Sequence, residues 1–468
     1  MVIELVTIDP QETSPADYFI ESVEMMFQTV YYEENYRGDA IMQEVHSDIF
    51  ILGAGAGGFG ACYQFTKCGY SVAIADQNPG YGGTAVYGGI CCWEPGVSLP
   101  GVHEILAQRL LSAGKAQVQK TVPSGWIVGS NSDEWVSERF PWGLSMETKE
   151  DYAQTLKRCR QFCNSPKDFR RFMTDGASLG QEMANLIHEN TGKCREFFNC
   201  KYAGCEQKEN LIHSVTLSNG TDLFKVYAKH FLDCSGSVVL ARDAGCKYAC
   251  GDDSGNLSGI NGVSLVFRVS KRGEEQPVQL KHFPDPTDWA ENRLARVVSC
   301  FNLYPNGDIN VNMLPTMTGE EMMQFGDNAW KIGCSRVKQY WERMQKEHGL
   351  AEYEIVEVFR LGIREDYRLI GRHVLDIEEI LLGNTDGDEI IAIADHPMDL
   401  HGIEGFRIGE LEKPYGIPLD CCRTNEYDNL FVVCRGASFT HAAAASARLS
   451  RTMISLGEGV AKRIINMF

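Results

Sequence analysis

The fold of this chain is decided by residues 49–58, which read IFILGAGAGG. Four apolar residues form an expected strand, and they lead directly into a G-x-G-x-x-G pattern at Gly53, Gly55 and Gly58. The first glycine permits a tight turn, the second lets the backbone approach a ligand, and the third allows a helix to pack closely on the strand. A helix is expected from Phe59 to about Cys68, and its free N–H groups would point back at the turn.

The residues after this helix fit the same interpretation. Residues 71–75 form a second expected strand, and Asp76 stands at its end, 21 residues after Gly55. A carboxylate at this distance is where dinucleotide-binding domains hold ribose hydroxyls. The alternative for Asp76 is an ordinary turn-forming role before Asn78-Pro79. Strand, turn, helix, strand and acid together predict a Rossmann-like dinucleotide-binding domain.

From about residue 47 to the end, the chain resembles FAD-dependent oxidoreductases of the glutathione-reductase-type flavoprotein fold, relatives of the fumarate reductase flavoproteins. The resemblance also extends to the Gly82-Gly83-Thr84 segment, which follows the second strand closely. Five segments carry it: residues 53–89, HFLDCSGSVVLARDAG at 230–245, IREDYRLIGRHVL at 363–375, HPMDLHG at 396–402, and DNLFVVCRGASFTHAAAASARL at 428–449.

The resemblance implies bound FAD and names the residues that would hold it. Where the family's second motif usually has Ala-Thr-Gly, this chain has Cys234-Ser235-Gly236, and its C-terminal motif has the altered order Cys434-Arg435-Gly436. His103 lies beyond the loop in which family members with attached flavin carry their histidine, so non-covalent FAD is expected. The expected FAD-binding residues are Gly53, Gly55, Gly58, Asp76, Gly83, Thr84, Ser235, Gly236 and Arg435.

Three residues are candidates for the chemistry beside the flavin. Arg364 could bind a substrate carboxylate, because a guanidinium offers a planar fork of donors; its alternative is an ion pair with Glu365 or Asp366. His401 could act as a general acid or base oriented by Asp399, or be a structural histidine. His441, after Thr440 at an expected helix start, is the third candidate.

Metal and cysteine chemistry find less support. His396, Asp399 and His401 form a local trio without a fourth ligand, so no metal site is predicted. Cys91-Cys92 follows the glycine-rich loop, but adjacent cysteines form strained disulfides, and apolar packing is the expected role. The remaining cysteines lack the tight C-x-x-C spacing of iron–sulfur ligation. There is also no G-x-S-x-G elbow of a serine hydrolase.

Composition excludes several partners and locations. The 468 residues carry a formal net charge of −19, so a nucleic-acid partner is not expected. No apolar run reaches about 18 residues, so no membrane span is expected. The N-terminus lacks the features of a signal peptide, and the 17 cysteines suggest no compact disulfide framework, which favours the cytoplasm.

Residues 1–46 look like an acidic N-terminal extension, with ten Asp or Glu and one Arg. Ser14-Pro15-Ala16-Asp17 reads as a helix start, and an apolar stripe follows it at helical spacing. The stripe would pack either on its own catalytic domain or on a second copy in a homo-oligomer. Its residues are Phe19, Ile20, Val23, Met26, Phe27, Val30 and Tyr31.

Other expected elements follow from periodicity and turn signals. Strands are expected at residues 211–217, 225–227, 230–233, 262–269, 308–313 and 429–434, and helices at 101–120, 168–187, 319–348 and from Thr440 to the C-terminus. Residues 78–93 are expected to form a loop.

The expected fold class is α/β. It consists of a discontinuous Rossmann-like FAD-binding domain at 47–252 and 402–468, an α+β substrate domain at 253–401, and the helical extension; residues 126–184 are a possible cap insertion. No second G-x-G-x-x-G with strand and acid occurs, so the unknown electron donor or acceptor must bind transiently or be a separate protein.

The expected function is flavin-dependent oxidation or reduction of a small organic substrate. Reduction of an activated double bond competes with dehydrogenation or oxidation of an alcohol or amine, and fold alone does not decide between them. The alternatives are an electron-transfer or partner-docking subunit with no small-molecule substrate of its own, and FAD-dependent modification of a macromolecule.

Overall fold

The computed structural model describes residues 42–93, 98–120, 170–280, 298–347, 349–401, 411 and 413–467. The predicted helix after Ser14 and most of the possible cap at 126–184 lie outside these residues. No helix in the described ranges combines the length and hydropathy that a membrane crossing needs.

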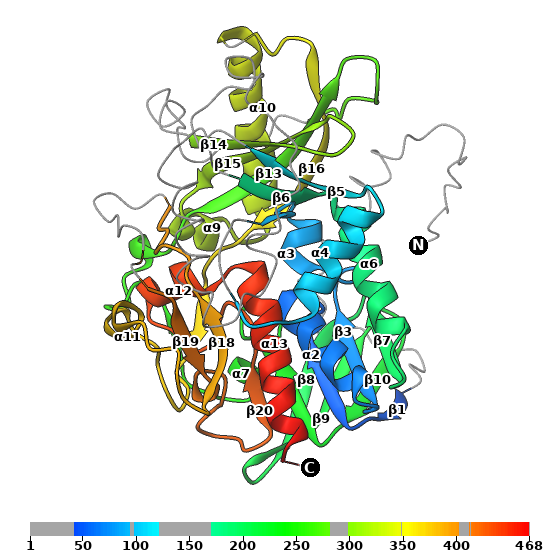
Figure 1. The fold of residues 1–468 in the computed structure, drawn as a ribbon, viewed down its shortest axis with the longest axis vertical. Helices are drawn as coiled ribbons and strands as arrows, with labels where there is room; N and C mark the ends of the chain where they lie inside the picture. Colours follow the sequence, from blue (N-terminus) through cyan, green and yellow to red (C-terminus); the bar gives the residue numbers. More distant parts are fainter. Residues whose placement is uncertain are drawn as a thin grey trace, which may run out of the picture.

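A five-stranded parallel sheet lies in the lower half of the molecule (Figure 1). Its order is β20 (Leu430–Val432), β11 (His230–Asp233), β2 (Ile49–Leu52), β3 (Val72–Asp76) and β7 (Cys194–Phe198). Successive side chains of a strand point to opposite faces, and both faces of β2 are buried here. Such apolar strands are typical of a parallel sheet covered on both sides.

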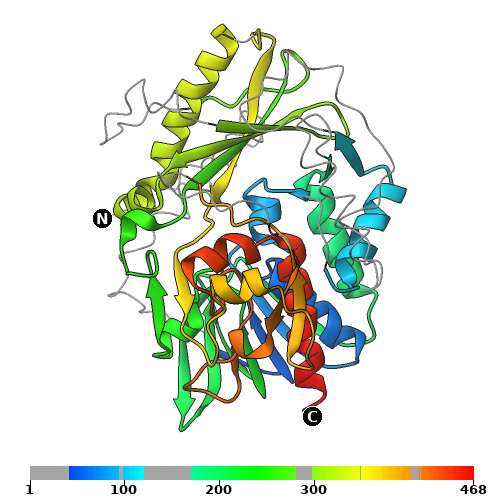
Figure 2. The same cartoon turned by 60° about the vertical axis from the view of Figure 1, so that its left-hand side comes forward.

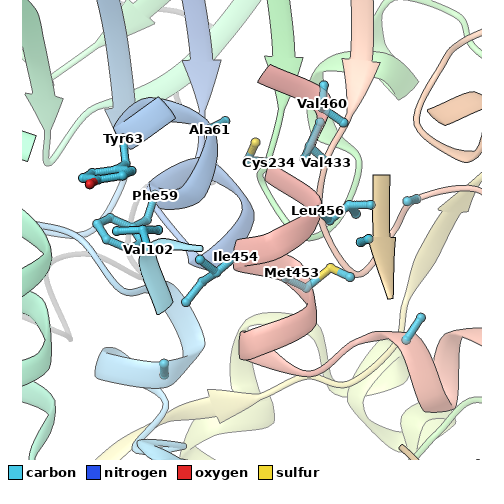
Figure 3. Close-up of a cluster of buried hydrophobic side chains, with 14 of the residues drawn as sticks. Phe59, Ala61, Tyr63, Val102, Cys234, Val433, Met453, Ile454, Leu456 and Val460 are labelled. Carbon is cyan, nitrogen blue, oxygen red and sulfur yellow. The ribbon is translucent and has the colours of Figure 1, made fainter. Parts of the chain in front are cut away.

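Different elements pack on the two faces of the parallel sheet. Ile49 and Ile51 belong to the core beneath helices α2 (Ala56–Lys67) and α13 (Ser450–Ile465). Figure 3 shows side chains of these two helices meeting in that core. Phe50 belongs to the opposite core, shared with a second sheet of β1 (Met42–His46), β10 (Leu223–Tyr227), β9 (Leu211–Ser218) and β8 (Lys201–Lys208).

An antiparallel sheet, here called the upper sheet, lies at the other end of the molecule (Figures 1 and 2). Helix α10 (Ala329–Glu347) covers one face of it through Leu265, Phe267 and Val311. Its strands, in spatial order, are β14 (Val298–Leu303), β15 (Ile309–Met317), β13 (Val263–Lys271) and β16 (Tyr353–Gly362).

Smaller elements connect these parts. A three-stranded sheet contains β4 (Cys92–Trp93), β6 (Arg170–Thr174) and β5 (Ala116–Lys120), and two-stranded sheets join β12 (Tyr248–Cys250) to β17 (Tyr367–Leu369) and β18 (Ile390–Ala394) to β19 (Tyr415–Pro418). The remaining α-helices are α3 (Gly83–Tyr87), α4 (Val102–Ser112), α6 (Gly176–His188), α7 (Val239–Asp243), α9 (Gly319–Phe325), α11 (Ile377–Leu382) and α12 (His441–Ala447).

The helix predicted at residues 101–120 is wrong in its second half. Helix α4 ends at Ser112, and Gly114 adopts a φ of 68°, the left-handed conformation that commonly ends helices. Strand β5 follows. The helix predicted at 168–187 likewise begins late, because β6 precedes it and Asp175 caps α6 by accepting from the Ser178 N–H at 2.7 Å.

Three other predictions also need correction. The predicted loop at 78–93 contains α3 and β4. The helix predicted at 319–348 is two helices, α9 and α10, separated by a 3-10 turn at Gly326–Asn328. The C-terminal helix is also two, α12 and α13, because Leu449 is extended between them.

Candidate functional site

The glycine-rich turn has the backbone that its sequence requires. Gly53 has a φ of 103°, and a Cβ there would overlap the carbonyl of Cys234 on the neighbouring strand's turn. A Cβ at Gly58 would overlap the Gly53 carbonyl. A larger residue at Gly53 would push the turn away from the end of β11, and one at Gly58 would push helix α2 away from the turn.

Gly55 differs from Gly53 and Gly58, because a Cβ at this position would overlap no other atom. The absence of a side chain here leaves open space. Gly55 is the N-cap of α2, its φ is −68°, and no side chain caps the helix. A Cβ on Gly55 would have only the Cα of Gly83 nearby, at 3.9 Å. The N-terminus of a helix with an open approach is suited to a phosphate group, so this turn fits the diphosphate of FAD.

Asp76 connects the end of β3 to the glycine-rich turn. It is 8% exposed; one carboxylate oxygen accepts from the Ala54 N–H at 2.7 Å, and the other from the backbone and side-chain N–H groups of Asn78, both at 2.8 Å. Burial raises the pKa of Asp76, while these hydrogen bonds act in the opposite direction. A carboxylate has about four acceptor positions, so it can also accept from a ribose hydroxyl.

The second and third expected FAD motifs meet in space. The Ser235 hydroxyl donates to Asp233 at 2.6 Å, and it accepts from the Val239 N–H at 3.0 Å. Gly236 has a φ of 85°, and the guanidinium of Arg435 lies where its Cβ would be. Arg435 also reaches Asp366 at 3.4 Å. The structure thus brings Ser235, Gly236 and Arg435 together, with Ser235 holding the local turn.

A buried carboxylate, that of Glu365, accepts hydrogen bonds from three neighbours at the start of helix α12. It accepts from Nδ1 of His441 at 2.8 Å, from the guanidinium of Arg368, and from the Asn261 N–H at 3.1 Å. Glu365 is 4% exposed, Arg368 2% and His441 7%. Thr440 caps the helix by accepting from the Ala443 N–H. These contacts hold the ring of His441 in one orientation.

Asn261 and Gly262 join this cluster to the other two candidates. Arg364 donates to the Gly262 carbonyl at 2.9 Å, and the Gly262 N–H donates to the carbonyl of His401 at 2.7 Å. The Asn261 side chain donates to the Asp399 carbonyl and accepts from the His401 N–H at 2.9 Å. Arg364, His401 and His441 therefore come from three distant segments and share one backbone junction.

His401 and Asp399 form a second histidine–carboxylate pair, with Nε2 of His401 2.6 Å from Asp399. Burial, with nearby Arg364, lowers the pKa of His401, although Asp399 acts in the opposite direction. Burial alone would raise the pKa of Asp399, but His401 and the charge of Arg448 lower it overall. Each partner thus favours the ionised form of the other, while burial of the ring lowers the pKa of His401 overall.

The stability of the Glu365 cluster can be tested directly. Glu365→Gln is expected to lower the free energy of unfolding by about 3 kcal/mol, because the buried guanidinium of Arg368 loses its buried carboxylate partner and keeps the half-exposed Asp253 at 3.9 Å. Adding Arg368→Met should restore part of the loss. Urea unfolding measures both. Glu378→Gln, on the exposed surface of α11, is the matched control, and equal effects at the two positions would contradict the prediction.

Sequence reasoning missed Asn261 and treated Glu365 only as an alternative ion-pair partner of Arg364. In the structure Glu365 pairs with Arg368 and His441, and Asp366 pairs with Arg435. Asn261-Gly262 has the dipeptide signature of a turn, which gave no signal of a junction. The one sequence signal is the run of three adjacent charges at 364–366, and the structure shows that all three are buried.

Comparisons with solved structures find flavoenzymes of low identity. The chain is similar to L-proline dehydrogenase from P. horikoshii (11% identity, TM-score 0.41, 91% of this chain and 94% of that chain covered). It is similar to L-amino acid deaminase from Proteus myxofaciens (11%, 0.42, 93% and 93%). It is also similar to a geranylgeranyl bacteriochlorophyll reductase-like protein from Thermoplasma acidophilum (12%, 0.42, 91% and 84%).

A sequence search of curated proteins finds no match. The family model described as FAD dependent oxidoreductase matches residues 48–463, nearly the whole described chain. This match confirms the resemblance drawn from the five sequence segments. The chain belongs to the FAD dependent oxidoreductase family.

Proposed function

We propose that the protein transfers a hydride between non-covalently held FAD and a small organic substrate. The observation that carries the proposal is the junction at Asn261-Gly262, which connects a cationic donor, Arg364, to two histidine–carboxylate pairs. Bound FAD would supply the electron-transfer chemistry, and the protein would supply position, charge and proton transfer.

The proposed cofactor site follows the three motifs. Gly53, Gly55 and Gly58 would place backbone N–H groups at the diphosphate, and Asp76 would accept from a ribose hydroxyl. Gly83 supports this arrangement because its Cα approaches that of Gly55. Thr84, Ser235, Gly236 and Arg435 would complete the site, on the strength of the resemblance.

Each proposed site residue acts on the substrate in its own way. Arg364 would hold a carboxylate or a developing oxyanion through its guanidinium. The Nδ1–H of His441 donates to Glu365, so Nε2 would accept or return a proton. His401, kept neutral by burial, could do the same through Nδ1, since its Nε2 faces Asp399.

We also propose that the chain is divided into two domains. Residues 47–252 and 402–468 would form the Rossmann-like FAD-binding domain, and residues 253–401 the substrate domain. We further propose a cytoplasmic protein with a transient electron donor or acceptor. A homo-oligomer formed through the N-terminal extension is the accompanying proposal for its assembly.

The first test is the visible spectrum of the purified protein before and after acid precipitation. Oxidised-flavin absorption that passes into the supernatant is the expected result. Colour that stays in the pellet would refute non-covalent binding, and a colourless protein that takes up no added FAD would refute the function. An anaerobic screen of amines, alcohols, hydroxy acids and activated alkenes should then find a compound that changes the flavin redox state.

The alternative of an electron-transfer subunit predicts a different result from the same screen. It predicts a flavin that responds to a redox protein partner but to no small molecule. Rapid bleaching of the oxidised flavin by one substrate class, or rapid reoxidation of the reduced flavin by an activated alkene, supports the enzyme.

A further inference from the structure

We propose that Arg360, which the upper sheet carries, is a cofactor-binding residue that pairs with the diphosphate of FAD. The inference rests on the proposed FAD site. It adds a cation from residues 253–401 to a site whose other proposed residues all lie in 47–252 and 402–468.

The first observation is where the Arg360 side chain ends. Arg360 lies near the end of β16, and its guanidinium donates to the side-chain oxygen of Asn78. Asn78 in turn donates twice to Asp76, and Asp76 accepts from Ala54 in the glycine-rich turn. A chain of hydrogen bonds thus runs from the upper sheet to the turn that faces the diphosphate.

The second observation is another neighbour of Arg360. Its guanidinium carbon lies 5.8 Å from the ring of Tyr87, in the helix α3 that begins at Gly83. A Cβ on Gly83 would be 2.8 Å from the Cα of Gly55. The guanidinium therefore contacts both Asn78 and Tyr87, and the segments that carry these residues contact the glycine-rich turn, through Asp76 at the Ala54 N–H and through Gly83 at Gly55.

The third observation is that the strand itself is held against the lower half. The ring of Phe359, the preceding residue, occupies the position that a Cβ on Gly89 would take. Asn310 of β15 donates to the Gly89 carbonyl at 2.9 Å. Arg360 is thus carried by β16, the edge strand of the upper sheet, close to the point where Phe359 and Asn310 pack this sheet on Gly89.

The positive charge of Arg360 indicates the kind of ligand that this position would bind. Burial lowers the pKa of Arg360, while Asp76 and Tyr87 act in the opposite direction, and a guanidinium remains charged at any physiological pH. A partly desolvated guanidinium is stabilised by an anion that can accept from its fork, and phosphate matches that geometry. A diphosphate against Gly55 would supply two negative charges beside it, where Asp76 now supplies one.

The experiment uses the full chain after removal of flavin, and titrates it with FAD, ADP and riboflavin. Arg360→Gln is expected to weaken FAD and ADP about 10- to 100-fold, because a charge-assisted hydrogen bond is lost. Binding of riboflavin, which has no phosphate, should change less than about twofold. The salt dependence of FAD affinity should also decrease.

Arg272→Gln is the matched control, since Arg272 directly follows β13 in the same sheet and pairs with Glu354 of β16 on an exposed surface. It should leave all three affinities unchanged. Urea unfolding of the flavin-free variants separates folding from binding. Equal FAD affinity in Arg360→Gln and wild type, or equal weakening of FAD and riboflavin, would overturn the inference. Wild-type protein that binds no FAD would instead refute the proposed function.

Discussion

Gly55→Val is expected to abolish tight FAD binding while leaving the flavin-free fold intact. The backbone of Gly55 is in a conformation open to any residue, and its only close neighbour on the side-chain side is the Cα of Gly83. The valine would fill the space proposed for the diphosphate. Loss of two charge-assisted hydrogen bonds, at about 1.5 to 3 kcal/mol each, predicts an affinity about 10²- to 10⁴-fold weaker.

Gly58→Val is the contrasting variant in the same turn. Its Cβ would overlap the Gly53 carbonyl, so this change should destabilise the apoprotein itself. FAD titration and urea unfolding of both flavin-free variants distinguish a blocked ligand site from a broken turn. Wild-type FAD affinity in Gly55→Val would show that the diphosphate does not lie there.

The strands of the parallel sheet were predictable because their pattern is local. Residues 49–52 and 230–233 were expected as strands and form β2 and β11 with the same bounds. Short apolar runs next to glycine turns leave few alternatives. The helix after the turn begins at Ala56 rather than Phe59, because Gly57 and Gly58 are helical where α2 packs on other backbone.

Helix ends and small strands were less predictable because contacts between distant segments decide them. Strand β5 exists because β6, more than fifty residues later, pairs with it. The sequence of 116–120 alone continues the helical pattern of α4. The break between α12 and α13 lies next to Arg448, the C-cap residue of α12. Arg448 forms an ion pair with Asp399, a residue about fifty positions earlier in the chain.

The candidate site was predictable as a set of segments but not as a set of partners. Arg364, His401 and His441 were each singled out, and the structure joins them through Asn261, a residue with no distinctive pattern. Periodicity cannot reveal that Glu365 pairs with Arg368 and His441. Arg360 lies on an ordinary strand, so its approach to Asn78 is visible only in three dimensions.

Replacement of His441 is expected to have the second large effect, on the rate of flavin reduction. The Nδ1 of His441 is held by Glu365, so an Asn at this position would keep a polar group beside Glu365 and remove the titratable Nε2. If His441 transfers a proton during flavin reduction, His441→Asn should slow that step about 10²- to 10⁴-fold. FAD affinity should change little, because the proposed contacts of His441 are with substrate.

A matched control for this change exists on the surface. His373 pairs with Glu379 at 2.9 Å and is 37% exposed at its side chain, so it repeats the histidine–carboxylate contact outside the site. Anaerobic stopped-flow measurement of flavin bleaching by the screened substrate, across pH, compares His441→Asn with His373→Asn. A slow rate in the first, with a wild-type rate in the second, is expected. A bleaching rate in His441→Asn within twofold of wild type would assign proton transfer elsewhere, and His401, with Nε2 on Asp399, would be the next residue to replace.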